Sequence, residues 1–284
     1  MKKLTVFLLT IVAVAVVSIS FTSCEEQAGV YKPEKKISTV YEQEPGEDEY
    51  IEQMFWKWNG DKVTSVSYYI RGEYRGKDEF IYDGKKVAKI VDNLGYYAEF
   101  VYDGKKFEKI KCYEPTGDLF AEVIFKYDGK KVSVITISPY DMDKSAISMF
   151  ERGFMSKLLP KERMNVVAKK LANPAKESLV FNLSYEGENL SSITEGSDVT
   201  IYSDYDTHSN VLYRFFPFST FHDDIDCQVF SKNNPGKITV KDHGETHYTI
   251  THIYTYDGDF PVTIQSHVDY LGESSQSTTH IKYE

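Results

Sequence analysis

The residues best suited to hold a metal ion lie in one short run, His222-Asp223-Asp224-Ile225-Asp226-Cys227. Carboxylate oxygens and imidazole nitrogens are common ligands of divalent cations, which makes His222, Asp223, Asp224 and Asp226 the candidates. The run lacks the glycine-spaced series of ligands of an EF-hand loop. A solvated loop that leads into a strand at residues 227–230 explains the same residues. We therefore expect no metal ion and no cofactor, and keep these four residues as the candidates.

Two further runs bring histidine close to acidic or hydroxyl side chains. His243 and His247 enclose Glu245, but a zinc protease needs both histidines on one face of a helix. The surrounding pattern is that of a strand, in which residues four apart lie about 13 Å from each other. His208 lies close to serine and aspartate, yet a catalytic triad is defined by geometry and not by proximity in sequence. The chain has no GxSxG nucleophile elbow, phosphate loop or dinucleotide motif, so we expect no enzyme.

Aromatic side chains offer a third kind of chemistry, because flat rings can stack on sugars and are enriched at interfaces. The chain has 22 tyrosines and two tryptophans. The candidate ligand-binding residues are Trp56, Trp58, Tyr82, Tyr102 and Tyr127. Tyrosine and phenylalanine also favour strands, so packing within a sheet is the alternative explanation.

Many of these aromatics belong to an internal repeat. Phe80-Ile-Tyr-Asp-Gly-Lys-Lys-Val-Ala-Lys-Ile90 recurs at residues 100–110 and 125–135, with looser copies that start at Trp56, Leu183 and Tyr254. The glycines of the first four copies of the repeat recur roughly every 20 to 25 residues, which fits two strands and two connections. Asp-Gly or Asn-Gly supplies the positive φ of a tight hairpin turn. Apolar and polar residues alternate on both sides, as in residues 96–102 and 262–270. The pattern predicts a mainly β protein, an antiparallel meander of hairpins that forms a strongly curved sheet or a barrel.

The strand pattern is interrupted once, at about residues 139–173. Ser138-Pro139 followed by Asp141 predicts a helix start, after which Ile147, Phe150, Phe154 and Leu158 keep helical spacing. A second helix is predicted from Pro160, with apolar residues at 164, 167, 168 and 171 and a stop at Asn173-Pro174. We expect this two-helix insert to cover an apolar sheet face or to plug the mouth of the curved sheet. A helix lying on a membrane is the alternative.

The N-terminus predicts export and a lipid anchor. Two lysines precede an uncharged apolar stretch from Leu4 to Phe21, which is the anatomy of a signal peptide. Phe21-Thr22-Ser23-Cys24 resembles a lipobox, which implies cleavage after residue 23 and a lipid on Cys24. Glu25-Glu26 resembles the export tag of surface-exposed lipoproteins. We therefore expect a signal peptide at residues 1–23, a flexible tether at 24–49 and one β-rich domain at 50–284, located at the outer membrane and exposed on the cell surface.

Charge and cysteine content limit the partners. The net charge is −10, whereas binding of nucleic acid requires clustered basic residues, so we expect no nucleic-acid partner. Cys112 and Cys227 could form one disulfide in an extracytoplasmic protein, but nothing local pairs them. The sequence leaves this bridge open.

The series of Tyr-Asp-Gly hairpins, from about Trp56 to the end of the chain, resembles a family of uncharacterised lipoproteins of the Bacteroidetes type described as having a porin-like fold. It is more remotely similar to the YD repeats of wall-associated proteins. Residues 231–238 and 254–261 also resemble the closing segments of that family. The resemblance implies a curved or closed antiparallel sheet and brings no activity or functional residues with it. The helical insert departs from the family's usual pattern, so closure of the sheet stays open.

Three functions follow from different classes of protein. The favoured one is a non-catalytic binding or structural module at the cell envelope, which meets a glycan, a peptide or another envelope protein. The second is a carrier that holds an apolar ligand inside a curved sheet capped by residues 139–173. The third is a hydrolase with a dispersed site. A binder should show exposed aromatics clustered on one face, a carrier a lined cavity, and a hydrolase a cleft that unites carboxylates or histidine.

Overall fold

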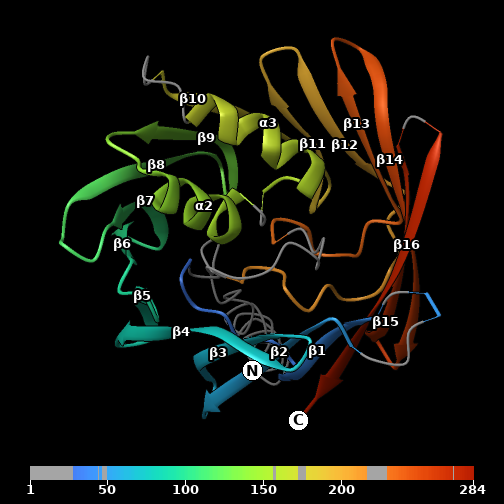
Figure 1. The fold of residues 1–284 in the computed structure, drawn as a ribbon, viewed down its shortest axis with the longest axis horizontal. Helices are drawn as coiled ribbons and strands as arrows, with labels where there is room; N and C mark the ends of the chain where they lie inside the picture. Colours follow the sequence, from blue (N-terminus) through green and yellow to red (C-terminus); the bar gives the residue numbers. More distant parts are fainter. Residues whose placement is uncertain are drawn as a thin grey trace, which may run out of the picture.

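The sheet closes into an antiparallel barrel whose strands follow one another in sequence order (Figure 1). The structure is a computed structural model and describes residues 28–43, 45–46, 50–155, 158–171, 177–215, 229–270 and 272–284. Within these residues each strand pairs with the next, and β1 (Ile37–Gln43) pairs with β16 (Glu273–Tyr283), which leaves no free sheet edge. The predicted meander is confirmed, and the closure that the sequence left open is decided in favour of a barrel.

The other elements fill the interval between these two strands. The strands are β2 (Glu52–Asn59), β3 (Lys62–Ile70), β4 (Glu73–Asp83), β5 (Lys86–Asp92), β6 (Tyr97–Asp103), β7 (Lys106–Tyr113), β8 (Leu119–Asp128), β9 (Lys131–Pro139), β10 (Leu179–Glu186), β11 (Asn189–Glu195), β12 (Asp198–Ser203), β13 (Lys237–Asp242), β14 (Glu245–Asp257) and β15 (Phe260–Tyr270). The helices, between β9 and β10, are α2 (Lys144–Gly153) and α3 (Lys161–Leu171). None of the helices that the structure describes is long and apolar enough to cross a membrane.

Two expected boundaries are wrong. The sheet begins at Ile37 and not near Tyr50, because residues 37–43 of the expected tether form β1, whose Ile37 and Val40 are buried in the core. The polar composition of the surrounding segment hid this strand, which contacts both β2 and β16. The first helix begins after Asp143 and not at Ser138-Pro139, because β9 continues to Pro139 and the Asp143 carboxylate caps the backbone N–H of Ala146.

The Asp-Gly turns lie together at one end of the barrel. Strands alternate in direction, so every second hairpin turn reaches the same end, and the turns at Gly60, Gly84, Gly104 and Gly129 all do so. Each of these glycines has a φ of 57° or 58°, a conformation that side chains rarely allow. We call this end the Asp-Gly rim and the other end the opposite rim. The opposite rim includes the turns at Gly72, Gly196 and Gly244.

The Tyr and Lys of the repeat join neighbouring turns of the Asp-Gly rim. The Tyr102 hydroxyl donates to the carbonyl of Val87 in the preceding hairpin at 2.5 Å. In return, Lys86 Nζ donates to the Gly104 carbonyl at 2.6 Å and lies 4.3 Å from the Tyr102 ring centroid. The same lysine contacts are made by Lys62 to the next turn, by Lys106 to the turn after Tyr127 and by Lys131 to the turn after Tyr185. The repeat is therefore a means of fastening successive hairpins side by side.

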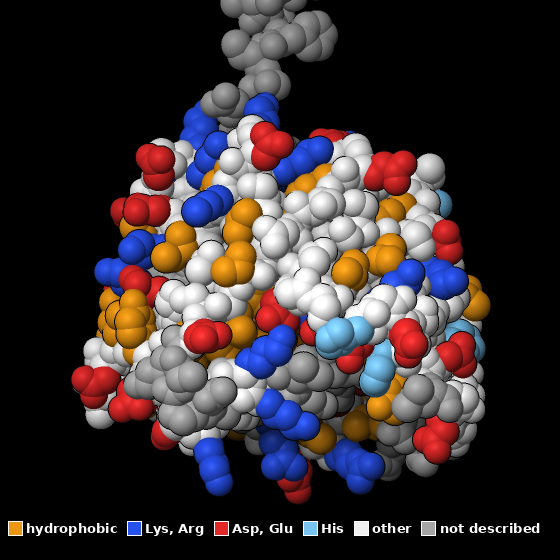
Figure 2. Space-filling model, turned by 90° about the horizontal axis from the view of Figure 1, so that it is seen from above, with side chains coloured by type: hydrophobic (Ala, Val, Ile, Leu, Met, Phe, Trp, Pro, Cys, Tyr) orange, Lys and Arg blue, Asp and Glu red, His pale blue; other side chains and the backbone are white. Residues whose placement is uncertain are grey.

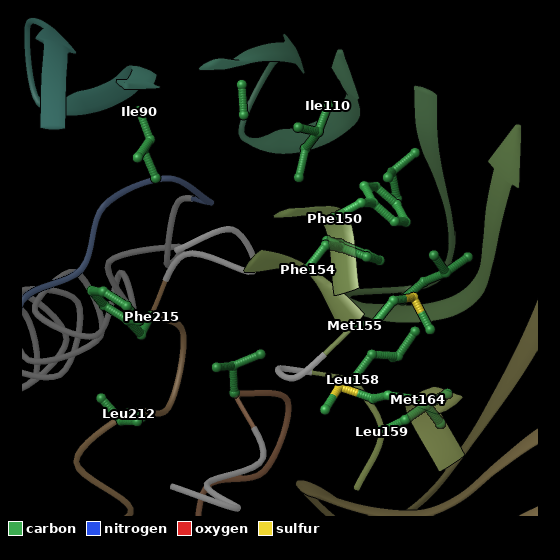
Figure 3. Close-up of a cluster of buried hydrophobic side chains, with 14 of the residues drawn as sticks. Ile90, Ile110, Phe150, Phe154, Met155, Leu158, Leu159, Met164, Leu212 and Phe215 are labelled. Atoms are coloured by element: carbon green, nitrogen blue, oxygen red, sulfur yellow. The ribbon is translucent and has the colours of Figure 1, made fainter. Parts of the chain in front are cut away.

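The barrel interior is filled from both ends. Figure 1 shows α2 and α3 inside the ring of strands, together with loop segments that join β12 to β13. The helices contribute Phe150, Val167 and Leu171, all buried in the core. From the Asp-Gly rim, Tyr31 donates its hydroxyl to the Val211 carbonyl. The helices and the loop segments share one cluster of buried side chains with the strands (Figure 3). Of the two roles expected for the helices, covering a sheet face or plugging the barrel, this packing supports the plug.

A buried ion pair holds α3 against the barrel wall. Arg163, whose side chain is 5% exposed, lies 3.4 Å from carboxylate oxygens of both Glu195 and Asp198. Lys170 lies 2.6 Å from Glu195. Removing one partner of a buried pair leaves an uncompensated charge, so this contact fixes where α3 docks on β11 and β12.

Charged residues occupy the middle of several strands on the outer wall. Lys77 pairs with Glu79 at 2.5 Å and Lys109 with Glu122 at 3.5 Å. In Figure 2, acidic and basic side chains are mixed over the visible side of the barrel, and hydrophobic ones form small separate groups. A barrel that spans a membrane carries instead an apolar band towards lipid. The described wall has the alternation of a sheet with one buried and one solvated face.

Candidate binding surface on the outer wall

One group of outward-facing aromatic side chains lies on the part of the outer wall formed by the neighbouring strands β16, β1, β2, β3 and β4. Residues that face each other across paired strands point to the same side of a sheet. His280, Tyr41, Gln53, Tyr69 and Tyr74 are such partners in succession. They form one row across five strands. We define the outer aromatic patch by six residues, Tyr41, Tyr50, Phe55, Tyr69, Tyr74 and His280.

The rings of the patch contact one another in two groups. Phe55 and Tyr74 lie on either side of Tyr69, with ring centroids 5.3 and 5.6 Å apart and edge-to-face geometry. Tyr50 packs on Tyr41 at 4.5 Å, and both lie near His280. Such contacts stabilise aromatic pairs beyond simple burial and hold the rings in fixed orientations.

Three rings of the patch remain open to solvent. Tyr50 is 38%, Phe55 39% and Tyr74 53% exposed. Exposed apolar residues that are scattered singly need no explanation, whereas contiguous ones mark interaction sites. The patch is therefore a candidate binding surface on the described wall.

A second row runs beside the first and is rich in lysine and hydroxyl groups. Lys282, Thr39, Phe55, Ser67 and Lys77 face one another in succession across the same five strands. Phe55 is the only aromatic in this row and belongs to the patch. Each end of the row carries a lysine, and Lys282 Nζ lies 4.8 Å from the Tyr41 ring centroid. The rings are thus flanked by donors of hydrogen bonds and by positive charge.

The five aromatics predicted from the sequence lie elsewhere, on the inner side of the Asp-Gly rim. Trp56 is 7% exposed and packs on Trp58, whose indole N–H donates to the Ile37 carbonyl at 2.7 Å. Tyr82, Tyr102 and Tyr127 are half-buried against the core. Burial raises the pKa of Tyr82 and of Tyr127 to about 12. The structure brings these residues together as packing partners, and a ligand-binding role for them stays a prediction.

Sequence reasoning missed the outer aromatic patch although its signal was present. Phe55 stands between the inward residues Met54 and Trp56, and Tyr69 follows the inward Tyr68. The signal is an aromatic residue at an outward-facing position of a strand in which inward and outward residues alternate. Only the pairing of β1 with β16 brings His280 beside Tyr41, because these two residues are far apart in sequence.

A polar cluster at the opposite rim unites Asp198, Asp242 and His243, whose potential ligand atoms lie within 4.8 Å of one another. Burial and the neighbouring Asp242 carboxyl raise the pKa of Asp198, while the His243 side chain lowers the pKa of Asp242. Asp198 also pairs with Arg163 and lies 3.8 Å from Lys170, which compete with a cation. His243 was singled out from the sequence, whereas Asp198 comes to it only through the pairing of β12 with β13.

His208 lies in a polar network that the loops between β12 and β13 build. The Asp206 carboxylate accepts hydrogen bonds from the Tyr256 hydroxyl and from Asn234. The His208 ring stacks on Tyr256 at 3.9 Å, and Ser209 donates to Asp259 and not to His208. The neighbouring serine, histidine and aspartate therefore do not form a triad.

Several predicted residues fall outside the described part of the chain. These are Cys24 and the metal candidates His222, Asp223, Asp224 and Asp226. Cys112 is a free thiol, fully buried, and burial raises its pKa above the usual value. Its suggested partner, Cys227, is also outside the described residues.

The fold defines the class of this protein as a closed antiparallel β-barrel of porin-like shape with a filled interior. No family model and no curated protein matches the sequence. Among solved structures the chain is similar to a porin-like protein from Bacteroides uniformis, with a TM-score of 0.53 and 11% identity over 87% of this chain and 98% of that one. It also matches a porin-like protein from Bacteroides vulgatus, with a TM-score of 0.42 and 13% identity over 88% and 99% of the two chains. The first likeness supports the porin-like fold implied by the Tyr-Asp-Gly hairpins.

Proposed function

We propose that this protein is a non-catalytic binding module of the cell envelope, which holds its ligand on the outer aromatic patch. The observation that carries the proposal is that three of the patch rings stay exposed on the wall of a barrel whose described interior is filled by its own helices and loops. An interior occupied by core side chains favours a ligand on the outside.

The start of the described chain supports a particular orientation on a lipid anchor. The Ala28 N–H donates to the Lys105 carbonyl at 2.7 Å, and the Gly29 carbonyl accepts from Val87, so the chain enters the barrel at the Asp-Gly rim. Ala28 is four positions after Cys24 in the chain, a span of about 14 Å at most. A lipid on Cys24 would hold the Asp-Gly rim close to the membrane.

In this orientation the outer aromatic patch is directed away from the lipid. Gln53, Tyr69 and Tyr74 lie beside the turns that join β1 to β2 and β3 to β4, both at the opposite rim. The proposed site would therefore be presented to the surroundings of an outer-membrane lipoprotein, where a glycan, a peptide or another envelope protein can reach it.

The alternatives have less support from the described residues. A carrier would need the helices to leave the interior, and α3 is held by the buried contacts of Arg163. A hydrolase would find carboxylates and histidine at the Asp198 cluster, but the His243 and Asp242 side chains are 79% and 56% exposed at a turn. The Arg163 contacts dock α3 on the wall, and the Asp198 cluster joins neighbouring turns of the opposite rim.

The test is a ligand screen by thermal unfolding of the purified full-length protein. A ligand that binds only the native state raises the midpoint by mass action. We would compare glycans, peptides, fatty acids and divalent metals on the native chain, on Phe55→Ser/Tyr74→Ala, and on Ile253→Ser, which removes an equally exposed side chain from another part of the wall. A shift kept by Ile253→Ser and lost by the patch variant supports the proposal. A shift that both variants keep, or no shift at all, contradicts it.

A further inference from the structure

The two rows of the outer wall have the form of an extended subsite. Neighbouring strands are about 4.8 Å apart, so a row across five strands extends about 19 Å. One step of the row is close to the length of one pyranose unit, and the whole row matches about four units. A linear chain of sugars could therefore lie across the strands and meet one side chain of each strand in turn.

The chemistry of the rows fits sugar rings. A pyranose has an apolar face of C–H groups, which packs on an aromatic ring, and an edge of hydroxyl groups, which needs hydrogen-bond partners. Phe55, Tyr69 and Tyr74 supply the rings. Gln53 stands between Tyr41 and Tyr69, and Ser67 lies beside Phe55. Tyr69 thus has an amide next to it, and Phe55 a hydroxyl.

The positive charge at the ends of the second row favours acidic sugars over neutral ones. The protein as a whole carries −10, yet Lys282 and Lys77 stand at the two ends of this row and Lys57 is exposed on the outward face of β2. Lys77 is paired with Glu79, whereas neither Lys282 nor Lys57 has a carboxylate partner among the described residues. Positive charge on a negative body favours an anionic ligand at this place.

The paired backbone argues against a peptide. Extended peptides are bound by adding a strand to an open sheet edge, and the described strands close into a ring without one. The rows also run across the strands and not along them. A chain that is recognised through its rings and side groups suits this surface better than one recognised through its backbone.

We infer that the outer aromatic patch binds a linear, uronic-acid-containing oligosaccharide of about four units, laid across β16, β1, β2, β3 and β4. This inference rests on the proposed function and names the ligand class of the same site. Tyr74, Tyr69 and Phe55 stack on the sugars, Gln53 and Ser67 bind hydroxyl groups, and Lys282 and Lys57 pair with carboxylates.

The experiment is calorimetric titration of the full-length protein in detergent with oligouronates of one to six units and with neutral oligosaccharides of the same lengths. We expect affinity to rise up to about four units and then level off, oligouronates to bind more tightly than neutral chains, and the difference to shrink in high salt. Tyr74→Ala should weaken binding about tenfold, and Lys282→Gln should remove most of the preference for acidic chains. Ile253→Ser should change nothing.

Each other outcome has a defined meaning. Binding that is unchanged by Tyr74→Ala, that does not depend on length, or that is equal for neutral and acidic chains overturns the inference. Absence of oligouronate binding also overturns it. In that case a patch-dependent thermal shift with a peptide would leave the proposed function standing, whereas loss of every patch-dependent shift would remove both.

Discussion

Truncation of Phe154 tests whether the barrel is filled, on which the choice between an outer site and an inner ligand depends. Phe154 follows α2, is 1% exposed, and has its ring centroid 5.5 Å from that of Phe150 and 6.5 Å from that of Phe125 on the wall. It lies in the middle of the interior cluster in Figure 3. Removal of a buried phenylalanine side chain costs about 3–5 kcal/mol, from lost burial and from the cavity that remains.

We therefore expect Phe154→Ala to lower the unfolding midpoint by about 6–20 °C, at about 2–4 °C per kcal/mol for a domain of this size. Phe154→Leu, which keeps much of the volume, should cost less than Phe154→Ala and shows whether the site tolerates repacking. Phe55→Ala is the matched control, because it removes the same atoms from the exposed outer wall and should cost less than about 1 kcal/mol.

The measurements are urea and thermal unfolding followed by circular dichroism. A cost for Phe154→Ala no larger than that for Phe55→Ala would refute the reasoning, because a ring packed between helix and wall cannot be removed without loss. The carrier function would then regain support, since the helices would not be packed into the barrel.

The remaining predictions concern the rim and one buried histidine. Tyr102→Phe removes a half-buried hydroxyl that donates to a backbone carbonyl and should cost about 1–2 kcal/mol in urea unfolding, while Tyr74→Phe, on the exposed wall, should cost almost nothing; equal costs would contradict the rim contact. Gly29→Ala places a Cβ against the Tyr102 hydroxyl at a φ of +77° and should lower the thermal midpoint more than Gly46→Ala, which has a φ of +81° and open space around it. Burial lowers the pKa of His252 from 6.5 to about 4. Below pH 6.5 the His252 imidazole therefore binds a proton in the unfolded chain but not in the folded protein. The free energy of unfolding should fall as the pH drops from 6.5 towards 4. His252→Gln should flatten this part of the urea midpoint against pH, and an unchanged slope would show that other groups cause it.

Local signals in the sequence determined the repeating parts of the fold. Asp-Gly at residues 83–84 and 103–104 requires positive φ and a tight turn, and the alternation of Ala98, Phe100 and Tyr102 sets one face towards the core. The spacing of Phe150 and Phe154 likewise predicted the helical interruption. These features need only near neighbours in the chain, which is why they can be read from it.

The tertiary structure decided the features that depend on pairing between strands far apart in the sequence. β1 is a strand because β16 and β2 lie on both sides of it, and the same pairing closes the barrel. Tyr82, Tyr102 and Tyr127 face inward at the Asp-Gly rim, whereas Tyr50, Phe55 and Tyr74 are among the exposed rings. Sequence alternation tells which residues share a face, but only the closed sheet tells which face is inside and which outward residues of distant strands become neighbours.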